Sequence, residues 1–369
     1  MPLPRLPGRL PRTLLGAGAL LALVILAAAC APNATQDSLK PAGRYAETID
    51  DLFRPVFWIA VAVFVVVEGM LVYLTVRYRH RRGRREIPPQ VHGNQRLEIA
   101  WTIVPAIILV GVAIPTISGI YALAAKPAGA LEVNVIGHQW WWEFEYPGLD
   151  VTTANVLHIP VGEPVYLSLC AAGAGYEEQP APSGCLKTAT NVGDSVIHSF
   201  WVPRLGGKQD VVPGRINHLL IQADRPGVYS GQCAEFCGLS HADMRFRVIA
   251  QPPAEYEECV REQQADAVTP QQGSLAATGL NEFLNGQCIA CHAIQGTDAA
   301  GIGGPNLTHF ASRDCFAGCI FDVTRANLAR WLKDPSAVKG GVPGGASMPD
   351  YDLTDEQIDA LIAYLMTLE

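Results

Sequence analysis

Three long apolar runs lie before residue 126 of this 369-residue chain, and mixed sequence follows them. The second run covers residues 56–76 and the third residues 99–125. At about 1.5 Å per residue, a helix over either run would cross the ~30 Å hydrocarbon layer of a membrane. The pattern predicts a transmembrane hairpin within residues 31–126 and further domains outside the membrane.

The first apolar run has the features of a secretory signal. Arg5, Arg9 and Arg12 precede it, and small residues follow it directly before Cys30. Residues 26–30 resemble the cleavage box of a bacterial lipoprotein, which predicts a signal peptide over residues 1–30 and a lipid on Cys30. Two alternatives stay open: ordinary cleavage that leaves an idle thiol, and an uncleaved extra helix.

The charge between the two predicted spans sets their orientation. Seven arginines lie between residues 77 and 96. Because positive loops stay in the cytoplasm, both termini and everything after residue 126 are predicted to lie outside. Glu68 is the one charged residue of the second run, and we expect it to contact an interface or another helix.

Short stretches of alternating apolar and polar residues follow the third run, as in residues 131–136. Proline and glycine punctuate them. This pattern is typical of an antiparallel β-sandwich, which we place over residues 127–252.

Soft metal donors gather near the end of the predicted sandwich: His198, Cys233, Cys237, His241 and Met244. Thiolate, imidazole and thioether together favour copper over hard cations. Two thiolates can bridge two copper ions, each completed by one histidine, with Met244 and the Glu235 carbonyl as weak ligands. The alternatives are a disulfide in a surface loop and a zinc site, but methionine is a poor zinc ligand.

The sequence CIACH at residues 288–292 is a haem c attachment motif. Cys288 and Cys291 would form thioethers with the porphyrin, and His292 would then reach the iron as proximal ligand. Polar residues 253–273 precede this region and predict a short helix and a linker.

The end of the chain supports the haem prediction. Residues 304–307 and 347–349 resemble the loop behind the proximal histidine and the distal methionine segment of small c-type cytochromes, so Met348 is the expected sixth ligand. A capping box at residues 354–357 begins an amphipathic helix. Met366 lies on that helix and is expected to pack in the core of the domain, and His309 is a further alternative ligand.

The remaining cysteines are assigned by their spacing. Cys170 and Cys185 bracket an inserted loop, where a disulfide is expected. Cys315 and Cys319 lie in a second insertion and are close enough in sequence to form a local disulfide. Cys259 is left unpaired.

The formal net charge is −8, and the chain from residue 270 onward holds five basic and eleven acidic residues. Such a surface disfavours nucleic acid and suits a basic protein partner. Simple surface solubility is the alternative explanation.

Four stretches together resemble cytochrome c oxidase subunit II: residues 98–109, 137–146, 196–215 and 231–244. The resemblance implies a multidomain membrane protein with a two-helix transmembrane hairpin, an all-β cupredoxin-like sandwich and a fused all-α class I cytochrome c domain. The domain boundaries that we expect are 1–30, 31–126, 127–252, 253–273 and 274–369.

The resemblance also implies roles for single residues. The dinuclear copper centre, CuA, would be held by His198, Cys233, Glu235 (carbonyl), Cys237, His241 and Met244. The Glu235 carboxylate would help to hold magnesium at the boundary with subunit I. Trp140 matches the tryptophan that accepts electrons, or it is a core aromatic, and its neighbours Trp141 and Trp142 leave open which ring is exposed. Glu98 would mark the entrance of a proton path, or is a plain charge at a helix entrance.

The implied function is an electron relay in a bacterial cytoplasmic membrane. A soluble cytochrome c or similar donor would reduce haem c, haem c would reduce CuA, and CuA would reduce haem in subunit I. Oxygen reduction coupled to proton pumping would occur outside this chain, in a complex with subunit I and subunit III.

Two other functions are compatible with parts of the pattern. The CuA subunit of a nitric oxide reductase would differ only in its partner subunit. A copper-delivery protein would share the copper ligands but would gain nothing from a haem. A nitrous oxide reductase would need a large propeller before its copper domain.

Overall fold

The structure is a computed structural model that describes residues 34–79, 92–174, 185, 195–339 and 348–369, together with Leu20, Leu21 and Val24. Apart from those three residues, the predicted signal sequence with Cys30 lies outside the described residues. The arginines between residues 80 and 91 do so as well.

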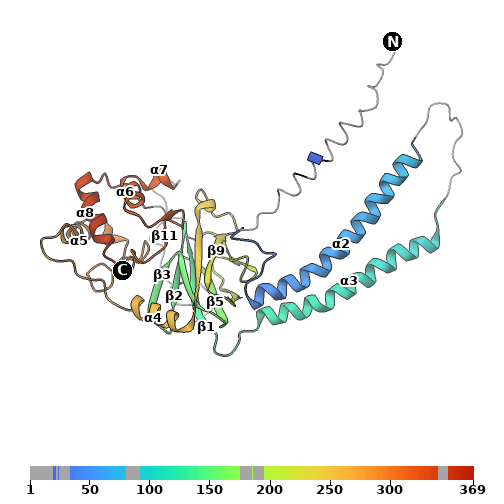
Figure 1. Ribbon diagram of the computed structural model, residues 1–369, viewed down its shortest axis with the longest axis horizontal. Coiled ribbons are helices and arrows are strands. Elements are labelled where there is room, and N and C mark those ends of the chain that lie inside the picture. Colours follow the sequence, from blue (N-terminus) through green and yellow to red (C-terminus); the bar gives the residue numbers. More distant parts are fainter. Residues whose placement is uncertain are drawn as a thin grey trace, which may run out of the picture.

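Helices α2 (Arg44–Arg77) and α3 (Gln95–Ala124) are long and apolar enough to cross a membrane. They extend side by side away from the β-domain (Figure 1). The side chain of Asn94 caps α3 by accepting hydrogen bonds from two backbone N–H groups of its first turn.

Helix α2 begins well before the apolar run because its first turns pack on the β-domain. Tyr45, Ala46 and Asp50 are buried there. A Cβ atom on Gly43 would lie 1.6 Å from the carbonyl oxygen of Gln222, so only glycine allows this close approach of two backbones. The transmembrane hairpin is thereby fixed to the sandwich at the start of α2.

The sandwich consists of two five-stranded sheets with the orders β3-β2-β1-β5-β8 and β4-β10-β9-β6-β7. The strands are β1 (Leu131–His138), β2 (Trp141–Tyr146), β3 (Val151–Ala154), β4 (Val156–Pro160), β5 (Val165–Ala171), β6 (His198–Trp201), β7 (Lys208–Val211), β8 (Asn217–Ile221), β9 (Gly227–Cys233) and β10 (Arg245–Gln251).

The prediction of an antiparallel sandwich is wrong for two strand pairs. β1 pairs with β5 in parallel, and β4 pairs with β10 in parallel. The chain changes sheets between β3 and β4 at Asn155, whose φ of 61° breaks the extended backbone. Alternation within a strand predicts which face is buried but does not predict the direction of its partner, which is why the sequence missed this.

The inner faces of the sheets bury aromatic rings. Trp142 and Phe144 project from β2, Phe200 from β6 and Phe246 from β10, all with 1% or less of their surface exposed. The rings of Phe200 and Phe246 stack with centroids 4.4 Å apart. This core supports the strand ends that carry the metal donors.

The C-terminal domain follows α4 (Pro253–Gln263) and contains α5 (Leu275–Asn285), the short helix η3 (Cys288–Ala290), α6 (Arg325–Lys333), α7 (Pro335–Val338) and α8 (Asp355–Leu365). The predicted capping box at Thr354 and Gln357 is present, and the apolar stripe of α8 is buried. A two-stranded ribbon, β11 (Cys315–Phe316) with β12 (Phe321–Asp322), is an addition to the helical fold.

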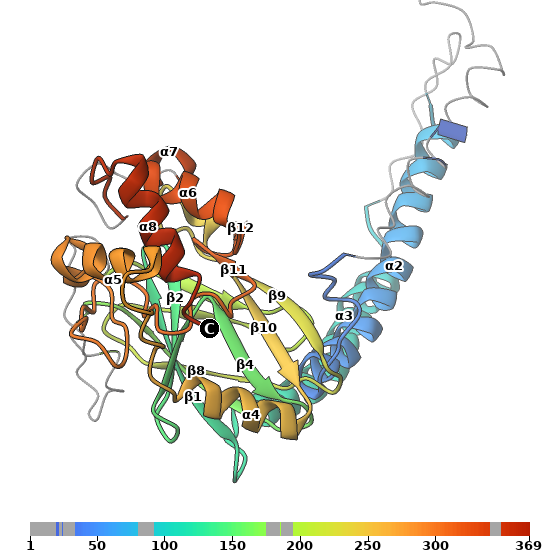
Figure 2. The same cartoon turned by 60° about the vertical axis from the view of Figure 1, so that its left-hand side comes forward.

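The C-terminal domain and the membrane hairpin lie at different sides of the sandwich (Figures 1 and 2). Figure 2 shows β11 and β12 beside the ends of β9 and β10. The backbone N–H of Arg245 donates a hydrogen bond to Gly318 O at 3.1 Å across this junction. The two redox domains are therefore packed against each other.

Candidate copper and haem centres

The soft donors predicted from the sequence meet at one end of the sandwich. His198 begins β6, Cys233 ends β9, and Cys237 lies in the loop that follows. His241 lies on η2 (His241–Asp243), and Met244 directly precedes β10. Neighbouring strands and one short loop thus deliver all five side chains to the same place.

Their spacing is that of a single cluster. The sulfur atoms of Cys233 and Cys237 are 3.8 Å apart, and Met244 Sδ is 3.8 Å from Cys237 Sγ. His198 Nδ1 lies 3.9 Å from Cys233 Sγ, and His241 Nδ1 lies 3.6 Å from Cys237 Sγ. The Glu235 carbonyl oxygen is 3.2 Å from Cys233 Sγ. Two thiolates therefore lie at the centre, with one imidazole beside each.

The electrostatics suit a bound cation. A hydrogen bond from Cys237, assisted by His198, lowers the pKa of Cys233 to about 3, while the same interaction raises the pKa of Cys237. His198 Nε2 is buried without a hydrogen-bond partner among the described residues, and Nδ1 faces the thiols. Two soft sulfurs and two imidazoles fit the donor preference of copper.

The three consecutive tryptophans occupy three different environments. Trp140 is 4% exposed, and its indole N–H donates a hydrogen bond to Cys237 O at 3.0 Å. The ring of Trp141 stacks on His138 with centroids 4.0 Å apart. Trp142 lies in the core, with its ring centroid 5.8 Å from that of His198. Only Trp140 is bonded directly to the loop that carries the copper donors.

A cavity of about 540 Å³ lies between the C-terminal domain and the sandwich. The C-terminal domain lines it with all four predicted haem residues, Cys288, Cys291, His292 and Met348. The sandwich lines it with Trp140 and Trp141. The side chains for a haem thus surround a space that reaches the copper domain.

The proximal histidine is held in one orientation. The Nδ1–H of His292 donates a hydrogen bond to Pro305 O at 2.8 Å, which leaves Nε2 free for iron. Burial lowers the pKa of His292, so the imidazole stays neutral, as a metal ligand must be. A Cβ atom on Gly304 would lie 2.7 Å from His292 Cε1, so a glycine lets this loop lie against the ring.

Met348 faces the same cavity, and the indole N–H of Trp331 donates to its sulfur at 3.1 Å. The alternative ligand His309 does not line the cavity, and its Nδ1–H donates to the Glu369 carbonyl at 2.8 Å. The residues of this cavity fit a haem c with histidine and methionine as axial ligands.

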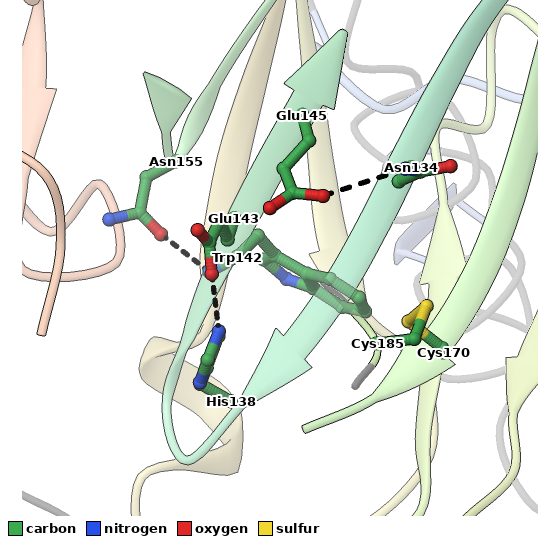
Figure 3. Close-up of polar contacts among 8 residues, drawn as sticks. All are labelled: Asn134, His138, Trp142, Glu143, Glu145, Asn155, Cys170 and Cys185. Carbon is green, nitrogen blue, oxygen red and sulfur yellow. Dashed lines mark hydrogen bonds and ion pairs between the residues drawn. A yellow bond between two sulfur atoms is a disulfide. The ribbon is translucent and has the colours of Figure 1, made fainter. Parts of the chain in front are cut away.

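Both cysteine pairs in the insertions form disulfides, with Cα–Cα separations of 5.8 Å for Cys170–Cys185 and 4.7 Å for Cys315–Cys319. Cys170 and Cys185 are both buried, in a small cluster with Ile136 and Ala172 that is separate from the main core, and Figure 3 shows their disulfide. Cys259 is a free thiol with its sulfur 3.4 Å from His158 Nδ1. Burial, aided by Glu262, raises the pKa of Cys259 to about 11.

The three carboxylates singled out from the sequence lie in different places, two on the membrane helices and one on the copper loop. Glu98 is exposed in the first turn of α3. Glu68 lies in an apolar groove between α2 and α3. The Glu235 side chain is half-buried on the copper loop.

Several residues around the two sites were missed from the sequence. Figure 3 shows His138 and Glu143 in contact on neighbouring strands, 2.9 Å apart, and Glu145 beside Asn134. Lys339 is buried between the two domains. The alternation of residues along β2 could have indicated the contacts of Glu143 and Glu145. No local pattern in the sequence indicates that Lys339 is buried.

Three families match this chain. The transmembrane domain of cytochrome c oxidase subunit II matches residues 33–118, its periplasmic domain matches residues 182–251, and cytochrome c matches residues 276–369. The periplasmic domain of subunit II of cytochrome oxidase (CoxB) of Bradyrhizobium japonicum is 23% identical, covers 38% of this chain and 97% of its own, and has a TM-score of 0.31.

Two relatives align over nearly the whole of this chain. Cytochrome c oxidase subunit 2 of Alkalihalophilus pseudofirmus is 38% identical over 354 residues, which are 94% of this chain and 95% of that protein. The protein of the same name from Bacillus subtilis strain 168 is 33% identical over 369 residues, or 95% of this chain and 96% of its own. With its CuA-type domain and its cytochrome c domain, this chain belongs to the cytochrome c oxidase subunit II family and is a subunit of a haem–copper oxidase.

Proposed function

We propose that this chain is the electron inlet of a terminal cytochrome c oxidase. A soluble donor delivers electrons to the C-terminal domain, the chain carries them to its copper domain, and subunit I uses them for oxygen reduction coupled to proton pumping. When bound, haem c and the copper pair each supply a centre that takes up and gives off one electron at a time.

One observation carries this proposal. The haem cavity is lined by Trp140, and Trp140 is hydrogen-bonded to the carbonyl of Cys237. A single side chain therefore contacts the space for one cofactor and the ligand loop of the other. The contact from the cavity to the copper loop lies within this chain.

The residues have the following proposed roles. Copper is held by His198, Cys233, Cys237, His241, Met244 and the Glu235 carbonyl. Cys288 and Cys291 attach the haem, and His292 and Met348 are its axial ligands. Trp140 is the aromatic contact between the centres. We assign the Glu235 carboxylate to a magnesium ion shared with subunit I, and Glu98 to the entrance of a proton path.

The proposed setting is a bacterial cytoplasmic membrane, with both redox domains and both termini on the outer side. The signal peptide is removed by cleavage directly before Cys30, and Cys30 carries the lipid. Subunit I covers the apolar faces of α2 and α3, which are exposed in the isolated chain. Subunit III is the other proposed membrane partner.

Optical and electron paramagnetic resonance spectroscopy of the purified complex test the assignment. We expect a low-spin haem c and a delocalised mixed-valence copper signal. Cys237→Ser should abolish the copper signal and keep the haem, while Cys259→Ser, the matched control, should keep both. A mononuclear copper signal in the unmodified chain would contradict the proposed bridging of two copper ions by two thiolates.

Transfer between the centres needs its own measurement. After a flash reduces the haem in the complex, the copper pair should be reduced at a rate independent of protein concentration. A rate that rises in proportion to the concentration of complex would show that electrons pass between molecules and would contradict the proposed route.

A further inference from the structure

The ribbon inserted into the cytochrome domain reaches from the haem cavity to the copper loop. We call residues 314–322 the docking hairpin. Phe316 and Ala317 on one side of it line the haem cavity. Phe316 is buried, and its ring contacts that of Trp331 edge-on with centroids 6.1 Å apart. The base of the hairpin is therefore part of the haem-domain core.

The tip of the hairpin packs against the backbone of the copper loop. Gly318 O accepts a hydrogen bond from the N–H of Arg245, the residue after the copper donor Met244. A Cβ atom on Gly318 would lie 2.1 Å from Asp243 O. Since real Cβ contacts do not become so short, any side chain at this position would push the two backbones apart.

The disulfide holds the shape of the tip. Ala317, Gly318 and Cys319 all have positive φ, at 55°, 77° and 54°. One hydrogen bond and one close contact face the copper domain: Gly318 O accepts from the N–H of Arg245, and the disulfide sulfur of Cys319 lies 3.4 Å from Asn155 O. The Cys315–Cys319 bridge closes the turn that presents them.

Lys339 joins the hairpin to the tryptophan. Its side chain is buried, and its terminal nitrogen, Nζ, donates hydrogen bonds to Trp140 O at 2.6 Å and to Ala317 O at 2.9 Å. A buried polar group needs such partners because it has left water. One lysine of the haem domain thereby fixes the backbone of Trp140 and the backbone of the hairpin relative to each other.

Arg247 adds weaker contacts at the rim. It lies 3.8 Å from Asp314 and 3.5 Å from Asp322, and both carboxylates are largely exposed. Exposed pairs of this kind contribute little to affinity. The geometry of the junction therefore depends mainly on Gly318 and Lys339.

We propose that the docking hairpin and Lys339 are positioning elements that set the separation between the haem cavity and the copper site, and thereby the rate of electron transfer inside the chain. The inference rests on the proposed relay. In the step concerned, one electron leaves ferrous haem and reduces the oxidised copper pair by one electron, with no bond made or broken.

The test uses the complete oxidase complex with both cofactors bound. Lys339→Met keeps the apolar stem and removes the donor, and Gly318→Val adds the side chain that the junction cannot accept. Lys333→Met is the matched control, because Lys333 belongs to the same domain but is exposed and paired with Asp355. The haem and copper spectra of every variant are recorded first, to show that both sites are intact.

Two readouts then decide. Pulsed electron paramagnetic resonance gives the separation of the two oxidised centres, and flash reduction of the haem gives the transfer rate. In the Gly318→Val, Lys339→Met double variant, the range of separations should widen and the rate should fall about tenfold or more, since small displacements of reacting groups are costly. Lys333→Met should match the unmodified chain.

The inference is overturned if the double variant keeps the separation and the rate of the unmodified chain. If the unmodified chain shows no transfer from haem to copper, the proposed relay fails instead. The separation measurement is independent of that transfer and still shows whether the hairpin and Lys339 position the domain.

Discussion

The indole N–H of Trp140 donates a hydrogen bond to the carbonyl oxygen of Cys237, 97 residues later in the chain. The side-chain amide of Gln139 donates to the same oxygen at 2.5 Å. A backbone carbonyl at the centre of the copper loop therefore accepts two hydrogen bonds from the turn between β1 and β2, which lines the haem cavity.

Trp140→Phe should slow reduction of the copper pair by the haem about tenfold or more, because the ring loses its bond to the copper loop and its fixed position. Flash reduction of the complex measures this rate. Trp141→Phe, which replaces an indole that stacks on His138, should have a smaller effect. Equal rates of copper reduction in the two variants would show that Trp140 does not have its proposed role.

Gly304→Ala should disturb the proximal histidine. The new methyl group would lie 2.7 Å from His292 Cε1, so the loop or the imidazole must move. Overpacking of this kind costs about 1–3 kcal/mol. We expect a lower thermal midpoint and a smaller fraction of low-spin haem in the absorption spectrum. Gly148→Ala is the control, since nothing lies within 4 Å of its Cβ position, and a normal haem spectrum in Gly304→Ala would contradict the close contact.

Gly279→Ala should loosen the crossing of α5 and α8. Its Cβ atom would lie 1.9 Å from Ala360 O, so the two helices must separate. The expected loss is about 1–3 kcal/mol, or more if the helices cannot shift. Urea unfolding followed by the haem absorption measures it, with Gly148→Ala again as the comparison. An unchanged midpoint would show that the helices have room to move apart.

Cys259 should resist alkylation although it is the one thiol expected to be free in the loaded protein. With a pKa near 11, its thiolate fraction at pH 8 is roughly 100-fold or more below that of an exposed thiol. Labelling with iodoacetamide should accelerate steadily from pH 8 to pH 10, as mass spectrometry can follow. Glu262→Gln should lower the pKa and speed labelling, whereas Glu257→Gln on the same helix should not. A labelling rate that levels off below pH 9 would contradict the raised pKa of Cys259.

The short-range parts of both sites could be predicted from the sequence. The haem residues Cys288, Cys291 and His292 lie close together in the chain. The same is true of the copper donors Cys233, Cys237 and His241. Their spacing alone therefore indicates their chemistry. The stripe of α8 and its capping box follow from local propensities in the same way. Each of these features depends on residues within a few turns of one another.

The long-range parts could not be predicted. Lys339 contacts Trp140 across 199 positions, and a lone lysine in a polar segment gives no sign of burial. The spacing of Cys315 and Cys319 predicted a disulfide but not that the bridged turn would face Asn155. The parallel pairing of β4 with β10 depends on a change of sheet at Asn155, which no periodicity records.

The contact between Gly318 and Arg245 also bears on biogenesis. Proteins are made and exported from the N-terminus, so the copper loop emerges before the hairpin that completes its packing. Until the last domain has emerged and folded, one side of the loop at Asp243 and Arg245 stays open to an incoming metal donor. That side is covered only after residues 314–322 have folded against it.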